Sequence, residues 1–281
     1  MTVDAHLHLW DRDLFAHDWL AQPALKKINR SFGLPDQPGG TGSELTGRVL
    51  VQALPDPQET EWLCGIADAS PVPTVVTGWV DLRRPDSLDA MLDRVLAAPG
   101  GGRLRAIRPM VQNEADPGWF DQAPVRASAS ILAERGLAVE FLVRERDWAS
   151  CLRLIDAVPQ GQYVLDHLGK PAVTASGPSA GWRSFVTDLS RREQTVVKLS
   201  GLLTECLFSD PTESVIAPYV LHALEEFSPR RAMYGSDWPV SVLATDDPSL
   251  WPSMLADIVG AHDPDLFTNT ARRVYTLEEN P

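Results

Sequence analysis

The sequence is poor in cysteine and in positive charge, and it contains no long hydrophobic run. Its three cysteines, Cys64, Cys151 and Cys206, are far apart and odd in number, so they form no pair with zinc-ligand spacing. We therefore expect reduced cysteines and a cytoplasmic location. No apolar run approaches the roughly 18 residues that cross a bilayer. The first residues lack the basic and apolar segments of a signal peptide, so secretion is not expected.

Acidic residues outnumber basic ones. Lysine and arginine total 25 and aspartate and glutamate 38, which gives a formal net charge of −13. Nucleic acids and anionic membrane surfaces attract positive charge, so we expect neither as a partner. A small anionic ligand is not excluded, because a few cations in one pocket can bind a carboxylate. The composition does not fix the oligomeric state.

Short apolar segments alternate with helical patterns along the whole chain. The near-continuous apolar segments are typical of parallel strands buried on both faces. Apolar residues recur at helical spacing at 88–96, 125–132, 148–155 and 215–227. We predict one α/β domain over residues 1–281, a single (β/α)8 TIM barrel, in which 35–42 and 178–181 are loops. The predicted strands are 3–9, 48–54, 74–82, 104–108, 137–143, 163–167, 195–200 and 231–238.

A long connection at 10–46 follows the first predicted strand. Loops of this length are usually functional or disordered. The segment contains Phe15, Trp19 and several prolines, and its aromatic content argues against disorder. We expect it to be partly helical and to fold over the mouth of the barrel.

Polar residues stand where the predicted strands end. His6 and His8 are two apart, so in a strand they share one face. The active sites of barrels of this kind lie at the carboxyl ends of the strands, and buried polar groups there would be costly without partners. The strand-end set is His6, His8, Gln52, Asp81, Arg108, Glu140, Asp166, His167, Ser200 and Asp237.

Eight segments, in order from end to end, resemble the amidohydrolase superfamily, and more closely its branch of sugar-lactone and 2-pyrone-4,6-dicarboxylate lactonases. They are DAHLHLW (4–10), VLVQA (49–53), GWVDL (78–82), LRAIRPMVQNE (104–114), VLDHLGKP (164–171), VKLSGLLTE (197–205), MYGSDWPV (233–240) and NTARRVY (269–275). The resemblance implies a barrel that hydrolyses a lactone ester, so a small-molecule lactone is the expected partner.

The resemblance also implies catalytic roles. Asp237 would be the general base on the attacking water, and the alternative for an isolated Asp is a turn or helix cap. His6 and His8 would flank the same water or polarise the lactone carbonyl. His167 would donate to a substrate oxygen or bind metal, unless it is a core histidine. Asp166 is expected to face the other way, in a structural role.

Four residues are candidates for substrate binding. Arg108 offers a planar fork for carboxylate or carbonyl oxygens. Lys170 and Arg144 could bind an anionic or hydroxyl group, or be plain surface charges. Trp238 would form part of the pocket wall. The similar proteins often carry His directly after the arginine, whereas here Pro109 follows, which puts one substrate contact in doubt.

A metal site is a further candidate. His6, His8 and Asp237 could hold zinc or manganese, with His167 nearby and Glu140 as a further ligand. Arg108 cannot ligate because it stays protonated. A lactone is already a reactive ester, so we expect no metal requirement. The alternatives are a metal-dependent decarboxylase or amide hydrolase, and a barrel that binds a sugar acid without turning it over.

Overall fold

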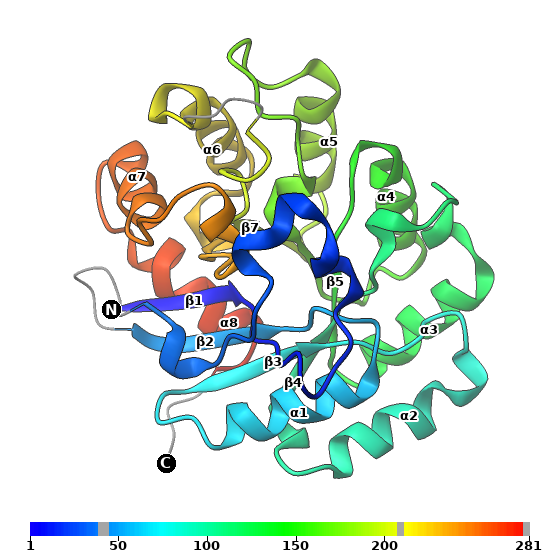
Figure 1. Ribbon diagram of the computed structural model, residues 1–281. Coiled ribbons are helices and arrows are strands. Elements are labelled where there is room, and N and C mark those ends of the chain that lie inside the picture. The colour runs from blue at the N-terminus through cyan, green and yellow to red at the C-terminus, as the bar shows by residue number, and fades with distance from the viewer. Residues whose placement is uncertain (39–44, 207–210, 278–281) are drawn as a thin grey trace.

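The computed structural model describes residues 1–38, 45–206 and 211–277, and it contains one parallel eight-stranded sheet in sequential order. All neighbouring strand pairs are parallel. The barrel prediction is confirmed (Figure 1). The strands are β1 (Thr2–Leu7), β2 (Leu45–Val51), β3 (Thr74–Gly78), β4 (Leu104–Ile107), β5 (Ala138–Phe141), β6 (Tyr163–Leu165), β7 (Thr195–Leu199) and β8 (Ala232–Tyr234).

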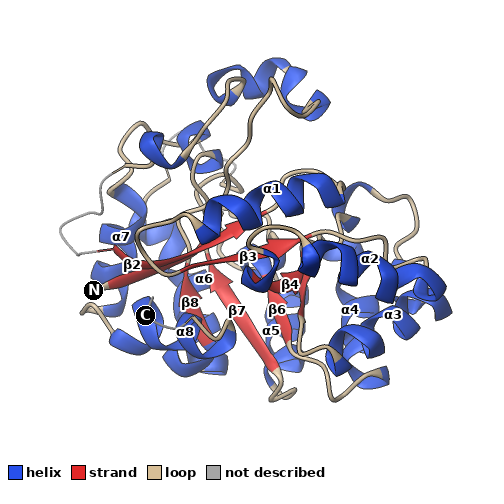
Figure 2. Cartoon of the chain, turned by 90° about the horizontal axis from the view of Figure 1, so that it is seen from below, coloured by secondary structure: helices blue, strands red, loops and turns tan. Residues whose placement is uncertain are grey.

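Helices surround the strands in Figures 1 and 2. All four predicted helical segments are confirmed, in α2, α3, α4 and α6, whereas the other α-helices were not predicted. The loop prediction at 178–181 is wrong in its second half, because the side chain of Ser179 accepts a hydrogen bond from the Trp182 N–H and starts α5 at Ala180. The described α-helices are α1 (Pro57–Asp68), α2 (Pro85–Ala97), α3 (Ala123–Glu134), α4 (Trp148–Ala157), α5 (Ala180–Ser190), α6 (Glu213–Phe227), α7 (Leu250–Val259) and α8 (Thr270–Val274).

The barrel closes between its first and last strands. Leu7 forms a parallel bridge with Trp238, directly beyond β8. Small and branched residues such as Val49, Val164 and Val196 form an apolar cluster that also includes Tyr275 and Leu277, from beyond α8. This cluster is separate from the larger one between the strands and the helices. It fills one end of the barrel, which leaves the other end for a functional site.

Several strands end earlier than predicted. The third was expected to reach Leu82 but ends at Gly78, and the eighth was expected to reach Trp238 but ends at Tyr234. The chain leaves the sheet at these points to form the loops of the barrel mouth. Side chains beyond the ends of these strands therefore need not alternate between the two faces of the sheet.

The long segment after β1 folds across the mouth, as Figure 1 shows in dark blue. It contains short 3-10 helices at Asp18–Ala21, Pro23–Ile28 and Leu34–Asp36. Trp10 and Phe32 exchange backbone hydrogen bonds of 3.2 and 2.9 Å, which closes the segment on itself. The prediction of a partly helical cover is confirmed for 10–38, and residues 39–44 lie outside the described part. Within the described residues, no helix is long and apolar enough to span a membrane.

Candidate active site

Three histidines and one aspartate meet at the mouth of the barrel. The Nε2 atoms of His6, His8 and His167 lie 3.8, 3.5 and 3.9 Å from Oδ1 of Asp237. All four residues are at most 5% exposed. The structure thus brings together the residues predicted to be catalytic, from the ends of β1, β6 and β8.

The backbone aims two of these side chains through an uncommon conformation. His167 and Asp237 both have φ of 54°, in the left-handed region that non-glycine residues seldom adopt. Asp237 is held there by hydrogen bonds from its own N–H to the His6 carbonyl and from the Ser241 N–H to its carbonyl, at 2.8 and 2.9 Å. Such strain persists only where neighbours fix it, and it concentrates at functional sites.

Hydrogen bonds orient the imidazole rings. Nδ1 of His8 donates to the Val51 carbonyl at 2.7 Å, which turns its Nε2 toward Asp237. Nδ1 of His167 lies 2.8 Å from the Ser200 hydroxyl, which leaves its Nε2 toward the same carboxylate. These hydrogen bonds thus fix which nitrogen of each ring faces the mouth.

A buried charge cluster lies directly behind His6. Asp166 bonds to Arg108 at 3.1 Å and to Nζ of Lys198 at 3.1 Å, and its Oδ1 is 3.4 Å from Nδ1 of His6. Nζ of Lys198 also donates to Glu140 at 2.7 Å and approaches Nδ1 of His6 at 3.2 Å. The carboxylates of this cluster thus balance two buried cations next to the His6 ring.

The expected orientation of Asp166 is wrong. It was predicted to face away from His167, but both side chains point into the barrel. The alternation fails because β6 ends at Leu165, and His167 and Leu168 both adopt left-handed φ values.

Sequence reasoning missed Lys198. The residue is two positions before Ser200 in β7, so strand alternation placed it on the same inward face.

Glu140 takes hydrogen bonds from Lys198, Thr77 and Tyr275, at 2.7, 2.7 and 2.6 Å. Glu140 was named as a further metal ligand, but these three donors already occupy its oxygens.

Burial strongly affects the protonation states of His6, His167 and Asp237. It lowers the pKa of His6 well below its usual value, against the opposing charge of Asp166, and it lowers the pKa of His167 to about 4. Burial alone would raise the pKa of Asp237, but the three imidazoles outweigh it and hold that pKa below its usual value. At neutral pH the site therefore combines neutral imidazoles at His6 and His167 with an ionised carboxylate.

The donor set fits a divalent metal ion. Nε2 of His6 and Nε2 of His8 are 3.1 Å apart, and with Asp237 they form a compact group of three ligand atoms. Zinc bonds of about 2.0–2.2 Å place tetrahedral ligands roughly 3.4 Å apart. Arg108 and Lys198, however, lie 3.4 and 3.2 Å from the two nitrogens of His6. These cations oppose the binding of another positive charge.

The four predicted substrate-binding residues do not lie together. Arg108 is 2% exposed and sits behind His6; within the described residues its Nε has no hydrogen-bond partner. Arg144 and Lys170 lie at the mouth, where both bind the carboxylate of Glu205.

Pro109 lines a separate pocket with Trp79, Asp81, Met110 and others. Asp81 there binds Arg83 and does not join the three histidines and Asp237.

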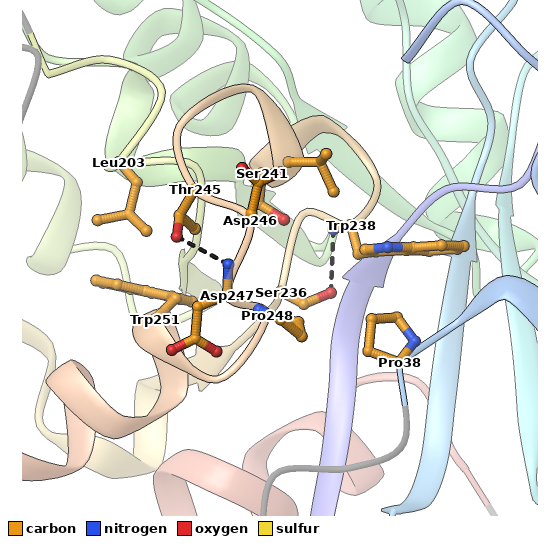
Figure 3. Close-up of a pocket in the computed structure, with 11 residues that line it drawn as sticks. Pro38, Leu203, Ser236, Trp238, Ser241, Thr245, Asp246, Asp247, Pro248 and Trp251 are labelled. Atoms are coloured by element: carbon orange, nitrogen blue, oxygen red, sulfur yellow. Dashed lines mark hydrogen bonds between the residues drawn. The ribbon is translucent and has the colours of Figure 1, made fainter. Parts of the chain in front are cut away.

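Trp238 belongs to a pocket beside the turn after β8. Figure 3 shows Trp238 and Pro38 on one side of it and Leu203 and Trp251 on the other. The Trp238 ring also packs edge-on against Phe32 of the covering segment, with centroids 5.3 Å apart. Asp237, the preceding residue, points instead toward the histidines. A direct contact between Trp238 and a lactone therefore stays a prediction.

The chain is similar to several known proteins over most of its length. A family model described as amidohydrolase matches residues 3–277. The L-fucono-1,5-lactonase of Burkholderia ambifaria is 34% identical over 86% of this chain and 81% of that protein. That of Burkholderia multivorans is 31% identical over 99% of this chain and 97% of its own length. A crystal structure of a Burkholderia multivorans amidohydrolase with bound zinc is 29% identical, with a TM-score of 0.88 over 99% of this chain and 100% of that one.

Proposed function

This chain belongs to the amidohydrolase family, and on that premise we propose that it hydrolyses the ester bond of a sugar lactone. Two relatives of at least 31% identity carry the name L-fucono-1,5-lactonase. The observation that carries the proposal is the convergence of His6, His8 and His167 on one ionised carboxylate at the mouth. A water molecule held among these groups would face any ester carbonyl placed above them.

In the proposed reaction, Asp237 accepts a proton from water as the water oxygen attacks the lactone carbonyl. The lone pair on Nε2 of His8 accepts the second water hydrogen and fixes the direction of attack. The Ser200 hydroxyl donates to Nδ1 of His167, so that Nε2–H of that ring stabilises the oxyanion. Protonated Asp237 then returns its proton to the leaving alkoxide, and the ring opens to the hydroxy acid.

The buried cations support the same step. Arg108 places positive charge beside His6, close to where the oxyanion develops. Lys198 and Asp166 hold His6 from behind. Lactone esters are reactive enough for this arrangement to act without a metal, and we propose that it does so. When a divalent ion is bound, His6, His8 and Asp237 would hold it, and it would polarise the carbonyl or lower the pKa of water.

A screen of neutral and acidic aldonolactones with a pH indicator tests the proposal, after subtraction of spontaneous hydrolysis. We expect the wild-type protein to open at least one neutral lactone and to keep its activity in EDTA. Asp237→Asn should lower kcat about 10²–10⁴-fold, because it removes the general base. Asp257→Asn, an exposed site on α7, makes the same chemical change away from the mouth and should have no effect.

Near-normal turnover by a folded Asp237→Asn protein would refute the assigned role. Complete loss of activity on chelation, restored by zinc or manganese, would favour a metal-dependent decarboxylase or amide hydrolase. Silence across the panel would favour a barrel that only binds a sugar acid.

A further inference from the structure

Three charged side chains form a cluster at the mouth, which we call the rim triad: Arg144, Lys170 and Glu205. The carboxylate of Glu205 accepts hydrogen bonds from the two terminal nitrogens of Arg144 at 3.1 and 3.5 Å. It also forms an ion pair with Nζ of Lys170 at 3.3 Å. The Lys170 and Glu205 side chains are 17 and 15% exposed, and that of Arg144 is 48% exposed. One carboxylate therefore occupies two cations, and its interaction with Lys170, the more buried of the two, is screened less than in open solvent.

The rim triad lies at the same end of the barrel as His167. Arg144 follows β5, Lys170 follows β6 and Glu205 follows β7, so all three lie at the carboxyl ends of the strands. The Lys170 N–H donates to the His167 carbonyl at 2.9 Å, and the Glu205 N–H donates to the Gly201 carbonyl at 3.3 Å. A ligand seated against His167 therefore has the rim triad beside it.

The charge state of the triad has a consequence for substrate choice. Arginine and lysine at a mouth would normally attract a ligand carboxylate. Here a carboxylate of the protein itself already fills that role. A ligand carboxylate would have to displace Glu205 and then lie near its negative charge. Ligand hydroxyl groups meet no such barrier, because they can donate to Glu205 and accept from the cations.

Building on the proposed function, we propose that Glu205 determines specificity. It holds Arg144 and Lys170 so that the enzyme takes lactones with uncharged ring substituents and rejects lactones that carry a free carboxylate.

The test compares kcat/KM for a neutral lactone, such as fucono-lactone, with kcat/KM for a carboxylate-bearing one, such as galactaro-lactone. In Glu205→Gln, which preserves shape and removes the charge, we expect the acidic-to-neutral ratio to rise at least tenfold, mainly through KM for the acidic lactone. The gain should shrink as salt is raised. Adding Lys170→Met should remove most of it.

Glu145→Gln is the matched control, because Glu145 is exposed and adjacent to Arg144 and the change also removes one negative charge. Its ratio should equal that of the wild type. An unchanged ratio in a folded Glu205→Gln protein, an equal gain in Glu145→Gln, or a wild type that prefers the acidic lactone would each overturn the inference.

Failure of the proposed function would be distinguishable, since it would appear as a wild type that opens no lactone. Isothermal titration with galactarate then asks the same question without turnover. Tighter binding by Glu205→Gln than by wild type supports the role of Glu205, and equal binding refutes it.

Discussion

Gly201 shows how closely the backbone approaches the imidazole of His167. The residue has φ of 66°, and a Cβ built on it would lie 2.5 Å from Nδ1 of His167. Real Cβ contacts are never that short, so either the ring or the loop must move. The absence of a side chain at position 201 therefore helps to place the imidazole against Ser200.

Gly201→Ala should lower kcat by about 10²-fold, because a displacement of a catalytic group by roughly 1 Å costs that much. Gly136→Ala is the control, since Gly136 has φ of 69° and no atom within 4 Å of the added Cβ. Steady-state kinetics and thermal melts of both variants separate displacement of the ring from backbone strain. Equal kcat in the two variants would contradict the steric argument.

At the element scale, a buried polar contact helps to hold the covering segment on α1, which Phe15 also meets at Trp62. Nε2 of His17 lies 3.2 Å from Glu59, whose other oxygen accepts the backbone N–H groups of Ala53 and Leu54, both at 2.8 Å. His17 and Glu59 are at most 1% exposed. The pair thus ties the cover both to the start of α1 and to the loop after β2.

His17→Ala should loosen the cover without unfolding the barrel. We expect faster proteolysis within residues 10–38 and a several-fold higher KM, with a fall in Tm of only a few degrees. Limited proteolysis with mass spectrometry locates the cleavage. His222→Ala on α6 removes a histidine far from the cover and should leave the cleavage pattern unchanged. Cleavage outside the segment in His17→Ala would mean that the contact stabilises the whole fold.

Lys198 joins parts of the whole barrel, because its ammonium group contacts residues of β1, β5 and the turn after β6. It is fully buried, as are Glu140 and Asp166. Nζ donates to Nδ1 of His6 at 3.2 Å and to Glu140 at 2.7 Å, and it forms an ion pair with Oδ1 of Asp166 at 3.1 Å. Removing the lysine would leave two carboxylates without a shared counter-ion.

Lys198→Met should lower the free energy of unfolding by about 3–5 kcal/mol, the usual cost of removing one partner from a buried ion pair. Urea denaturation measures the loss. The double variant Lys198→Met with Glu140→Gln should recover part of it, because the second change removes a stranded charge. A single variant within about 1 kcal/mol of wild type would show that the cluster relaxes or takes up a proton at little cost.

The fold could be predicted from the sequence because its strands are near-continuous apolar runs that only parallel packing buries. Several helices could not: α8 spans five residues, and α5 begins in a segment that reads as a loop. The meeting of His6, His8 and Asp237 followed from their positions at the predicted strand ends, although β8 itself ends at Tyr234. The orientation of Asp166 did not follow, since it depends on left-handed turns beyond β6. Glu205 gave no signal, because loop positions carry no periodicity.

Closure of the barrel has a consequence for how the protein is made. The bridge between Leu7 and Trp238 joins two segments that are far apart in the sequence, so β1 is translated well before its partner. On the ribosome, β1 emerges long before its second neighbour exists, and its His6 has no Asp237 to face. A nascent chain therefore carries an open sheet edge and no assembled site until translation has passed β8. Any chaperone that shields such edges would act on β1 during that interval.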